Sequence, residues 1–434
     1  MSGPHLSEQE VIRREALAQL RNLGIDPYPP EAFLISHSPQ EILSQFKDEE
    51  AERWTEVSIA GRLMSRRIQG KASFAVLMDS GTRIQLYFNR DEICPGEDKT
   101  LYNTVFKKLL DLGDIIGVNG FVFRTRVGEI TVHVTSFTLL AKSLRPLPMV
   151  KTDAEGNTYD AFSDPELRHR MRYVDMLVND GVKDTFILRS RIISSMRRFF
   201  DSKGWLEVET PVLQAIHGGA AARPFTTHHN SLDMPLYLRI ANELYLKRLL
   251  VGGLNGVYEI GKMFRNEGMD RTHNPEFTSM EIYVAYQDYH WMMTMTEQLL
   301  ENIAKEVLGS TQVEFDGKTL EFKGPYKRIS LFDSILEATG VDISQMDEQA
   351  LREQCKAWHI EVSPEMGRGK LIDEIFGEKV EASLIQPTFI TDYPLIMTPL
   401  AKKHRNKEGL VERFELFING KEVANAYSEL NDPI

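Results

Sequence analysis

Residues 264–283 read FRNEGMDRTHNPEFTSMEIY and gather charged side chains between two segments that look like strands. Arg265 offers a planar fork of donors that suits a carboxylate or a phosphate. Because side chains alternate along a strand, Phe277, Glu281 and Tyr283 share one face. The stretch therefore predicts a site for a charged ligand. The alternative is an exposed hairpin whose Arg–Glu pairs contribute ~0 to 1 kcal/mol each.

A basic cluster in GRLMSRRIQGKASF indicates a second kind of chemistry. Four basic residues come within ten positions with no acid among them, and an aromatic residue follows: Arg62, Arg66, Arg67, Lys71 and Phe74. Such residues can hold phosphates while a base stacks on the ring, a contact that contributes ~1 to 3 kcal/mol per base. The alternative is a solvated basic strand beside a core phenylalanine.

Five short, β-branched segments between residues 55 and 140 must position this basic cluster. They alternate in polarity and are separated by glycine-containing turns. A helical stretch, TLYNTVFKKLLDLG, lies between the third and the fourth segment. The pattern predicts a five-stranded closed barrel of the oligonucleotide-binding (OB) kind, and a carbohydrate- or protein-binding barrel is the alternative. A helix with a capping box at Ser7 and Glu10 precedes it.

The remaining sequence predicts a second, larger domain. Residues 1–145 form the helix and barrel, residues 146–180 are rich in proline and charge and read as a linker, and residues 181–434 form the second domain. In the last of these, FILRSRIISSMRRFFDSKG predicts a long helix, and WLEVETPVL predicts a strand at a sheet edge or a domain boundary. This helix and strand pack either into the core or into a subunit interface. An inserted helical region with its own hairpin is expected around 290–385.

The composition is that of a globular protein. The chain has 434 residues, of which 42% are hydrophobic and 26% charged, and a net charge of −12. Such a negative charge argues against a general coat of nucleic acid but leaves local basic patches. Cys94 and Cys355 are too far apart to predict a disulfide framework or a metal site, so a reducing cytoplasm is expected. No stretch approaches the ~20 apolar residues of a membrane span, so no membrane partner is expected.

The stretch at 264–283 resembles motif 2 of the class II aminoacyl-tRNA synthetases. Three further segments extend the likeness to the bacterial type of the lysyl-tRNA synthetase family, over nearly the whole chain: GGAAARPF at 218–225, RIANELYLKRLLVGG at 239–253 and FELFINGKEVANAYSELND at 414–432. The resemblance implies an α+β fold, with an N-terminal anticodon-binding OB barrel and a catalytic antiparallel sheet flanked by helices. It also implies a homodimer formed partly through residues 185–213.

The activity that the resemblance implies is the ATP-dependent ligation of L-lysine to tRNA(Lys). The lysine carboxylate attacks the α-phosphorus of ATP, pyrophosphate leaves, and the lysyl group then passes to the 3′ end of the tRNA. Positioning and stabilisation of developing charge are the main requirements of such chemistry. No nucleophile from the protein is therefore expected.

The family's residue roles carry over where this sequence matches. Arg265 would be the catalytic residue that bridges the amino-acid carboxylate and the α-phosphate. The matches to the lysine pocket are Gly219, Glu243, Arg265, Glu281, Tyr283, Asn425 and Glu429. The matches to the ATP site are Arg265, Glu267, His273, Phe277, Glu415 and Glu422, with the Phe277 ring against adenine. The matches to the uridine-rich anticodon are Arg67, Phe74 and Gln85.

A hairpin is predicted in FELFINGKEV from its central Asn-Gly turn. In the simplest register Leu416 faces Val423, which makes Glu415 and Glu422 diagonal neighbours within ~7 to 8 Å. Two such carboxylates repel unless a cation lies between them, which favours Mg²⁺ bound with ATP over two solvated acids.

Two features of the C-terminal segment depart from a simple match. Strict alternation puts Asn425 and Glu429 on the face opposite Glu422, so we expect a bulge near 424–426. Family members also continue past ELNDPI into a glycine-rich motif 3 whose arginine packs over ATP, so we expect this chain to form lysyl-adenylate poorly. The alternative function is a catalytically silent tRNA- or lysine-binding relative. The presence of Arg265, Glu267, Glu415 and Glu422 favours the ligase, because a non-catalytic protein need not keep groups that bind phosphate and metal.

Overall fold

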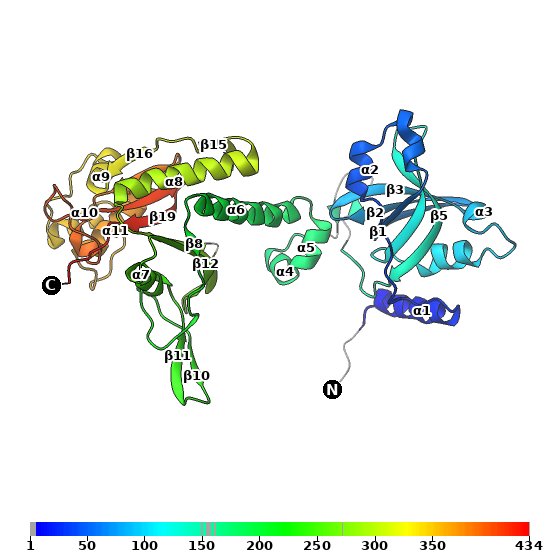
Figure 1. The fold of residues 1–434 in the computed structure, drawn as a ribbon, viewed down its shortest axis with the longest axis horizontal. Helices are drawn as coiled ribbons and strands as arrows, with labels where there is room; N and C mark the ends of the chain where they lie inside the picture. Colours follow the sequence, from blue (N-terminus) through cyan, green and yellow to red (C-terminus); the bar gives the residue numbers. More distant parts are fainter. Residues whose placement is uncertain (1–5, 149–150, 153–157, 160–161, 271, 434) are drawn as a thin grey trace. The chain divides into compact units, whose positions relative to one another are not determined.

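The computed structural model describes residues 6–148, 151–152, 158–159, 162–270 and 272–433. The chain divides into two compact units, residues 1–186 and 187–434 (Figure 1). The expected linker at 146–180 lies partly outside the described residues. Its described part contains two short strands and two short helices: β6 (Lys151–Thr152), β7 (Thr158–Tyr159), α4 (Pro165–Arg170) and α5 (Arg172–Val178).

The first unit contains the predicted barrel. Its five strands close in the order β1-β2-β3-β5-β4. They are β1 (Val57–Gln69), β2 (Ala72–Asp79), β3 (Thr82–Asn89), β4 (Ile115–Arg124) and β5 (Ile130–Ala141). Gly120 lies at a register shift of β4 against β5, where an added Cβ would come within 1.9 Å of the His133 carbonyl oxygen. Only glycine therefore allows these two strands to approach so closely.

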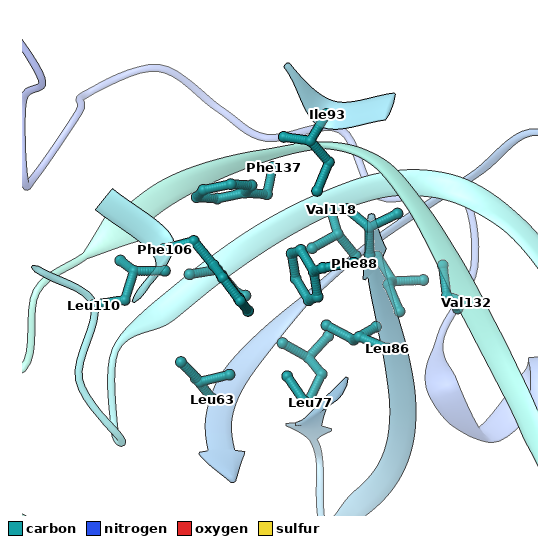
Figure 2. Packing of buried hydrophobic residues seen from close by; sticks show 14 of the residues in the cluster. Leu63, Leu77, Leu86, Phe88, Ile93, Phe106, Leu110, Val118, Val132 and Phe137 are labelled. Carbon is teal, nitrogen blue, oxygen red and sulfur yellow. The ribbon is translucent and has the colours of Figure 1, made fainter. Parts of the chain in front are cut away.

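Alternating apolar residues of the strands fill the barrel (Figure 2). Leu63, Leu77 and Leu86 are fully buried, as the period-two pattern requires. Between the third and fourth strands lie the short helix α3 (Arg90–Ile93) and the π-helix η2 (Leu101–Leu109), which confirms the expected helical stretch. The Phe106 ring of η2 stacks on Phe88 with the ring centroids 4.2 Å apart. This helix thus supplies part of the barrel core.

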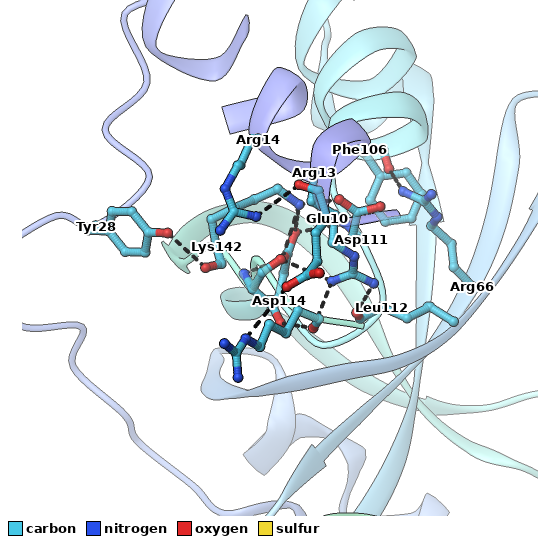
Figure 3. A network of polar contacts seen from close by, with 12 residues as sticks. Glu10, Arg13, Arg14, Tyr28, Arg66, Phe106, Asp111, Leu112, Asp114 and Lys142 are labelled. Carbon is cyan, nitrogen blue, oxygen red and sulfur yellow. Dashed lines mark hydrogen bonds and ion pairs between the residues drawn. The ribbon is translucent and has the colours of Figure 1, made fainter. Parts of the chain in front are cut away.

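A buried polar network fastens the N-terminal helix α1 (Glu8–Asn22) to the barrel (Figure 3). The predicted capping box at its start is present. Arg13 donates to the carbonyl oxygens of Leu112 and Ser143 at 2.9 and 3.0 Å. Beside it the ammonium of Lys142, buried completely, lies 2.9 Å from the buried carboxylate of Asp114 and also contacts Asp111. Two more helices, α2 (Pro39–Gln45) and the 3-10 helix η1 (Asp48–Trp54), precede the barrel.

The second unit is built around a long hairpin and a four-stranded sheet. The hairpin joins β12 (Gly256–Phe264) to β13 (Glu276–Val284). The other sheet has the order β16-β17-β18-β19, with β16 (Lys327–Ser330), β17 (Thr388–Thr391), β18 (Arg413–Ile418) and β19 (Lys421–Tyr427). The β16–β17 pair is parallel and the other two pairs are antiparallel.

Helix α6 (Val182–Ser202) begins a few residues before the predicted helix. The segment after it forms two short strands, β8 (Leu206–Glu207) and β9 (Leu213–Gln214), instead of one. Pro211 lies between them and cannot donate to a strand ladder, which accounts for the break. Both strands are at sheet edges, as predicted: β8 beside β12, and β9 beside β11 (Met234–Leu238), which pairs with β10 (Thr226–His229).

Five further α-helices of the second unit follow α6: α7 (Glu243–Val251), α8 (Tyr289–Ile303), α9 (Leu331–Thr339), α10 (Glu348–Ala357) and α11 (Arg368–Lys379). The shorter helices are η3 (Ala304–Leu308), η4 (Glu381–Ser383) and η5 (Leu395–Met397). The hairpin expected in VEFDGKTLEF is formed by β14 (Gln312–Phe315) and β15 (Lys318–Glu321). In the part of the chain that the structure describes, no helix combines the length and the apolar character that crossing a bilayer requires.

Candidate functional site

The end of β12 carries an arginine with an unused donor. The Arg265 backbone N–H donates to the Pro275 carbonyl oxygen at 2.8 Å, which closes the base of the loop. Its guanidinium lies over the Phe277 ring, with the Cζ atom 5.2 Å from the ring centroid. Arg265 Nε is buried and finds no acceptor among the described residues. A buried donor without a partner is costly, so this position fits an anionic ligand.

The loop between β12 and β13 presents Glu267 and His273, and both are exposed. Asp270 organises the loop, because its carboxylate accepts the backbone N–H groups of Thr272 and His273, each at 2.7 Å. These bonds and the His273 ring hold the pKa of Asp270 well below its usual range. Asp270 therefore holds the backbone of Thr272 and His273 in place, while the predicted nucleotide-binding side chains of Glu267 and His273 remain accessible.

A cluster of carboxylates, which we call the carboxylate pocket, lies further along the same hairpin. The Tyr283 hydroxyl donates to Glu281 at 3.1 Å, as the shared face predicted. Burial raises the pKa of Glu281, and the nearby Glu243 carboxylate adds to the increase. Gly219 packs against Glu243 with φ at +88°, and an added Cβ would lie 3.1 Å from the Glu243 Cβ. The structure thus brings together four of the predicted lysine-pocket residues.

A buried ion pair beneath this pocket was missed by sequence reasoning. Glu259 of β12 is the cross-strand partner of Glu281. Its carboxylate accepts from Arg239 at 2.6 Å and from the Asn242 amide at 2.9 Å. Because Arg239 compensates the charge of Glu259, only Glu281 of this pair is left to meet a cation. The sequence signal for Glu259 was its charge within the otherwise apolar strand pattern VYEIG.

The C-terminal hairpin turns at Asn419 and Gly420, as predicted, with φ values of 51° and 69°. Its register differs from the expected one: Leu416 pairs with Ala424 and not with Val423. The shift follows the pair of Phe417 with Glu422, so the bulge lies at Val423, just before the expected 424–426. An extra residue in one strand moves each later side chain of that strand to the other face of the sheet.

This bulge brings Asn425 to the face of the acidic pair. The Asn425 amide donates to Glu415 at 3.2 Å and to Glu422 at 3.3 Å. Glu415 also accepts from the Tyr393 hydroxyl at 2.7 Å and contacts Arg413. Desolvation by the surrounding chain and the Glu415 charge raise the pKa of Glu422 to about 7, although the residue as a whole is exposed.

The Arg413 guanidinium compensates only one of these two carboxylates, so a cation such as Mg²⁺ would relieve the repulsion between Glu415 and Glu422. Within the described ranges no group of three or more His, Cys, Asp or Glu side chains could enclose a metal ion. Mg²⁺ commonly takes one or two carboxylates and completes its shell with phosphate oxygens and water. Glu415 and Glu422 therefore suit an ion that arrives with a nucleotide.

Glu429 joins the carboxylate pocket through a lysine that sequence reasoning missed. The Lys247 ammonium lies 2.7 Å from Glu429 Oε1 and 2.5 Å from Glu243 Oε1. The Tyr427 hydroxyl donates to the same Glu243 oxygen at 3.2 Å. The signal for Lys247 was its spacing of four residues from Glu243 on one helix. Glu429, 186 positions further on, could be placed only by the fold.

One row of side chains crosses the barrel through all five strands. The cross-strand partners are, in order, Arg67, Phe74, Tyr87, His133 and Phe121. The Arg67 guanidinium lies 5.6 Å from the Phe74 ring centroid. The successive ring centroids from Phe74 to Phe121 are 5.3, 4.9 and 4.5 Å apart.

These rings are partly exposed and lie outside the buried core cluster of the barrel. Gln85 lies two residues before Tyr87 on the same face of β3, and it is also partly exposed. The predicted residues Arg67, Phe74 and Gln85 are thus brought to one surface. Sequence reasoning missed Tyr87, His133 and Phe121, although the alternation along their strands was a usable signal.

Two family models match this chain. The model for class II tRNA synthetases (D, K and N) matches residues 164–434, and the model for the OB-fold nucleic acid binding domain matches residues 57–140. The chain is 62% identical to the lysine–tRNA ligase of Porphyromonas gingivalis strain W83 over 429 residues, which are 99% of this chain and 74% of that protein. It is 62% identical to the lysine–tRNA ligase of Christiangramia forsetii, with the same coverage. The lysine–tRNA ligase of Azobacteroides pseudotrichonymphae is 59% identical, with 85% of its length covered.

Proposed function

Because the chain belongs to the lysine–tRNA ligases among the class II aminoacyl-tRNA synthetases, we infer how its two units divide the reaction. The family uses ATP to activate lysine as lysyl-adenylate and transfers the lysyl group to tRNA. We assign tRNA recognition to residues 1–145 and lysine activation to residues 181–434, joined by residues 146–180. The three carboxylates at Glu243, Glu281 and Glu429 are the observation that carries the assignment of the lysine site.

Lysine is held by charge at both of its ends. Glu243 and the backbone around Gly219 take the α-ammonium, while Glu281, Tyr283 and Glu429 surround the side-chain ammonium. Tyr283 supports this arrangement, because its hydroxyl already orients Glu281. Asn425 lies near the lysine carboxylate. A pocket this acidic rejects amino acids whose side chains are neutral or negative, since its carboxylates would then be left without a counter-charge.

Arg265 is the catalytic residue in this proposal. Its unpaired Nε offers a donor to the lysine carboxylate or to the α-phosphate, and its guanidinium can hold both reactants together. Bringing nucleophile and phosphorus into line removes much of the entropic barrier. Negative charge that develops on the phosphate is stabilised by the same guanidinium.

The nucleotide extends from Arg265 toward the loop and the acidic pair. Phe277 stacks on adenine, Glu267 accepts from its amino group, and His273 meets the terminal phosphates. Glu415 and Glu422 hold Mg²⁺, which neutralises phosphate charge when it is bound. The Asn425 amide between the two carboxylates supports this role, because it keeps both on one face.

The barrel binds the anticodon of tRNA(Lys). Arg67 contacts a phosphate, Phe74 stacks on an anticodon base, and Gln85 hydrogen-bonds to a base edge. The continuation of the ring row through Tyr87 supports a stacking surface, because each base presents a π-face to an aromatic ring.

The protein forms a homodimer partly through residues 185–213. Several large apolar side chains in and near this range are exposed, among them Ile187 at 41% and Leu213 at 49%. Several exposed large apolar side chains in one segment support its use as a subunit interface. Cys94 and Cys355 are buried and free, which fits a reducing cytoplasm.

Lysine-dependent exchange of pyrophosphate into ATP tests the lysine-site assignment. We expect the exchange that the parent protein catalyses, although slow, to require lysine. The Arg265→Ala variant should lose about a further 10²- to 10³-fold in rate, as removal of one charge-stabilising donor does elsewhere. Lys318→Ala, on the β14–β15 hairpin, is the control and should exchange normally. Exchange that proceeds equally well in the Arg265→Ala variant would contradict the catalytic role.

A further inference from the structure

A lysine of the protein itself lies inside the carboxylate pocket. Lys247 is four residues after Glu243 on α7, and its ammonium bridges Glu243 to Glu429 with contacts of 2.5 and 2.7 Å. The second partner is 182 residues further along the chain. The Lys247 side chain is only 25% exposed, so it is more buried than a lysine in an ordinary surface ion pair on a helix. The contact therefore joins two elements of the pocket that the backbone does not join.

The contacts of Lys247 use one oxygen of each carboxylate. On Glu243 both Lys247 and the Tyr427 hydroxyl contact Oε1, and on Glu429 Lys247 contacts Oε1. The other oxygen of Glu243, Oε2, faces Gly219, where an added Cβ would lie 3.8 Å from it. A ligand ammonium in the pocket thus still finds an acceptor on Glu243.

The environment favours the charged form of Lys247. Burial alone disfavours an ammonium, but the hydrogen bonds to Glu243 and Glu429 outweigh it and raise the pKa of Lys247 above its usual range. The Tyr427 ring lies 5.9 Å from the ammonium and adds a weak attraction. Lys247 is therefore a permanent positive charge at neutral pH.

The charges of the pocket then match those of free lysine. Glu243, Glu281 and Glu429 are three carboxylates, whereas Glu259 is compensated separately by Arg239. Lys247 offsets one of the three. The two remaining negative charges equal the two ammonium groups of free lysine, whose carboxylate is left for Arg265. A ligand with a single ammonium would leave one of these partly buried carboxylates without a counter-charge.

We propose that Lys247 is a positioning residue that holds Glu243 and Glu429 in place for the substrate and sets the residual charge of the pocket to that of two ammonium groups. The inference rests on the proposed lysine pocket of Glu243, Glu281 and Glu429. Lys247 does not contact the reacting atoms. It acts through the two carboxylates, as an internal counter-ion that remains when the pocket is filled.

Calorimetric titration of the full chain with lysine, and separately with ATP, tests the proposal without requiring turnover. Lys247→Met removes the charge at similar length, and we expect lysine affinity to fall roughly ten-fold or more while ATP affinity stays within about two-fold. Lys305→Met is the matched control, because Lys305 makes the same i,i+4 contact with Glu301 at 2.5 Å on a solvated surface. It should bind both ligands as the parent does.

Two further variants keep the test decisive. Propylammonium matches the part of the Lys247 side chain that Lys247→Ala removes. Added propylammonium should therefore restore lysine affinity in this variant, whereas in the parent protein it should only compete with lysine. Lys247→Arg keeps the charge but displaces it, and it should weaken lysine alone by several-fold. If the Met and Ala variants fail to fold, the Arg variant carries the test by itself. An unchanged lysine affinity, or equal losses for lysine and ATP, overturns the proposal.

The Glu281→Gln variant separates this inference from the function on which it rests. If Glu281→Gln weakens lysine while the Lys247 variants do not, only the role of Lys247 is wrong. If Glu281→Gln also leaves lysine affinity unchanged, the pocket itself has been assigned to the wrong residues.

Discussion

Glu415 faces Asn425 across the β18–β19 hairpin, with the amide of Asn425 3.2 Å from the Glu415 carboxylate. The pair exists because the bulge at Val423 shifts the register by one residue. Without this bulge, Asn425, Tyr427 and Glu429 would lie on the opposite face. A single extra residue thus joins the proposed metal pair to the lysine pocket.

Removal of the bulge should abolish lysine binding. Deletion of Val423 restores simple alternation and turns Asn425 and Glu429 away from the pocket, so we expect lysine affinity to fall by more than about 10²-fold. Calorimetry with lysine measures the loss, and Val423→Ala, which keeps the extra residue, is the control. A folded deletion variant with parental affinity would contradict the role of the register.

Glu281→Gln should weaken lysine far more than ATP. Loss of one partner of a buried ion pair costs ~3 to 5 kcal/mol, which is about 10²- to 10⁴-fold in affinity. The amide still accepts from the Tyr283 hydroxyl, so the pocket should keep its shape. Separate titrations with lysine and ATP give the two affinities. Equal losses for both ligands would show that Glu281 does not meet the lysine side chain.

The same variant should stabilise the ligand-free protein at neutral pH. Burial raises the pKa of Glu281 in the folded state, so the folded state holds this proton more tightly than the unfolded chain does. The stability that the protonated carboxyl contributes is present at low pH and is lost as the pH rises through the folded pKa. We therefore expect Glu281→Gln to raise Tm at about pH 8 and to change it less at about pH 4. A lower Tm for the variant at about pH 8 would contradict the expected direction of the stability change.

The ring row on the barrel should contribute to tRNA affinity and little to stability. Phe74→Ala is expected to weaken tRNA(Lys) binding by ~1 to 3 kcal/mol, because a base loses its stacking partner. If only Phe74 contacts a base, Tyr87→Ala should weaken tRNA(Lys) binding less than Phe74→Ala does. If Tyr87 also contacts a base, the two variants should weaken binding equally. Phe88→Ala is the contrasting variant, since Phe88 is fully buried in the core and its loss should mainly lower Tm. A large fall in Tm for Phe74→Ala would show that Phe74 belongs to the core.

Lys142→Met should destabilise the first unit. The ammonium of Lys142 is completely buried between Asp111 and Asp114. Its removal leaves the buried Asp114 carboxylate without a counter-charge, with only the backbone N–H groups of Asp111 and Ser143 as donors. Breaking a buried pair in this way costs ~3 to 5 kcal/mol. Urea unfolding measures the change. Lys47→Met is the control, because Lys47 is exposed and its contact with Glu50 at 3.8 Å contributes ~0 to 1 kcal/mol.

The sequence by itself determined the local elements, and it predicted most of the candidate site. Alternation with glycine turns predicted the five barrel strands, and the Asn-Gly pair predicted the hairpin turn, because these signals depend only on neighbouring residues. The face shared by Glu281 and Tyr283 was predicted in the same way. The resemblance to a family then suggested the roles that we propose for Arg265, Phe277 and the acidic pair.

Only the tertiary structure decided which distant residues meet. The bulge at Val423 was expected one residue too late, because the position of a bulge depends on how β18 and β19 pack against the rest of the sheet. Lys247 could not be assigned to Glu429, since their contact joins two segments 182 residues apart. The row from Arg67 to Phe121 required the strand order of the closed barrel, which places β5 between β3 and β4. Long-range pairing of this kind depends on burial and packing, and no local pattern records it.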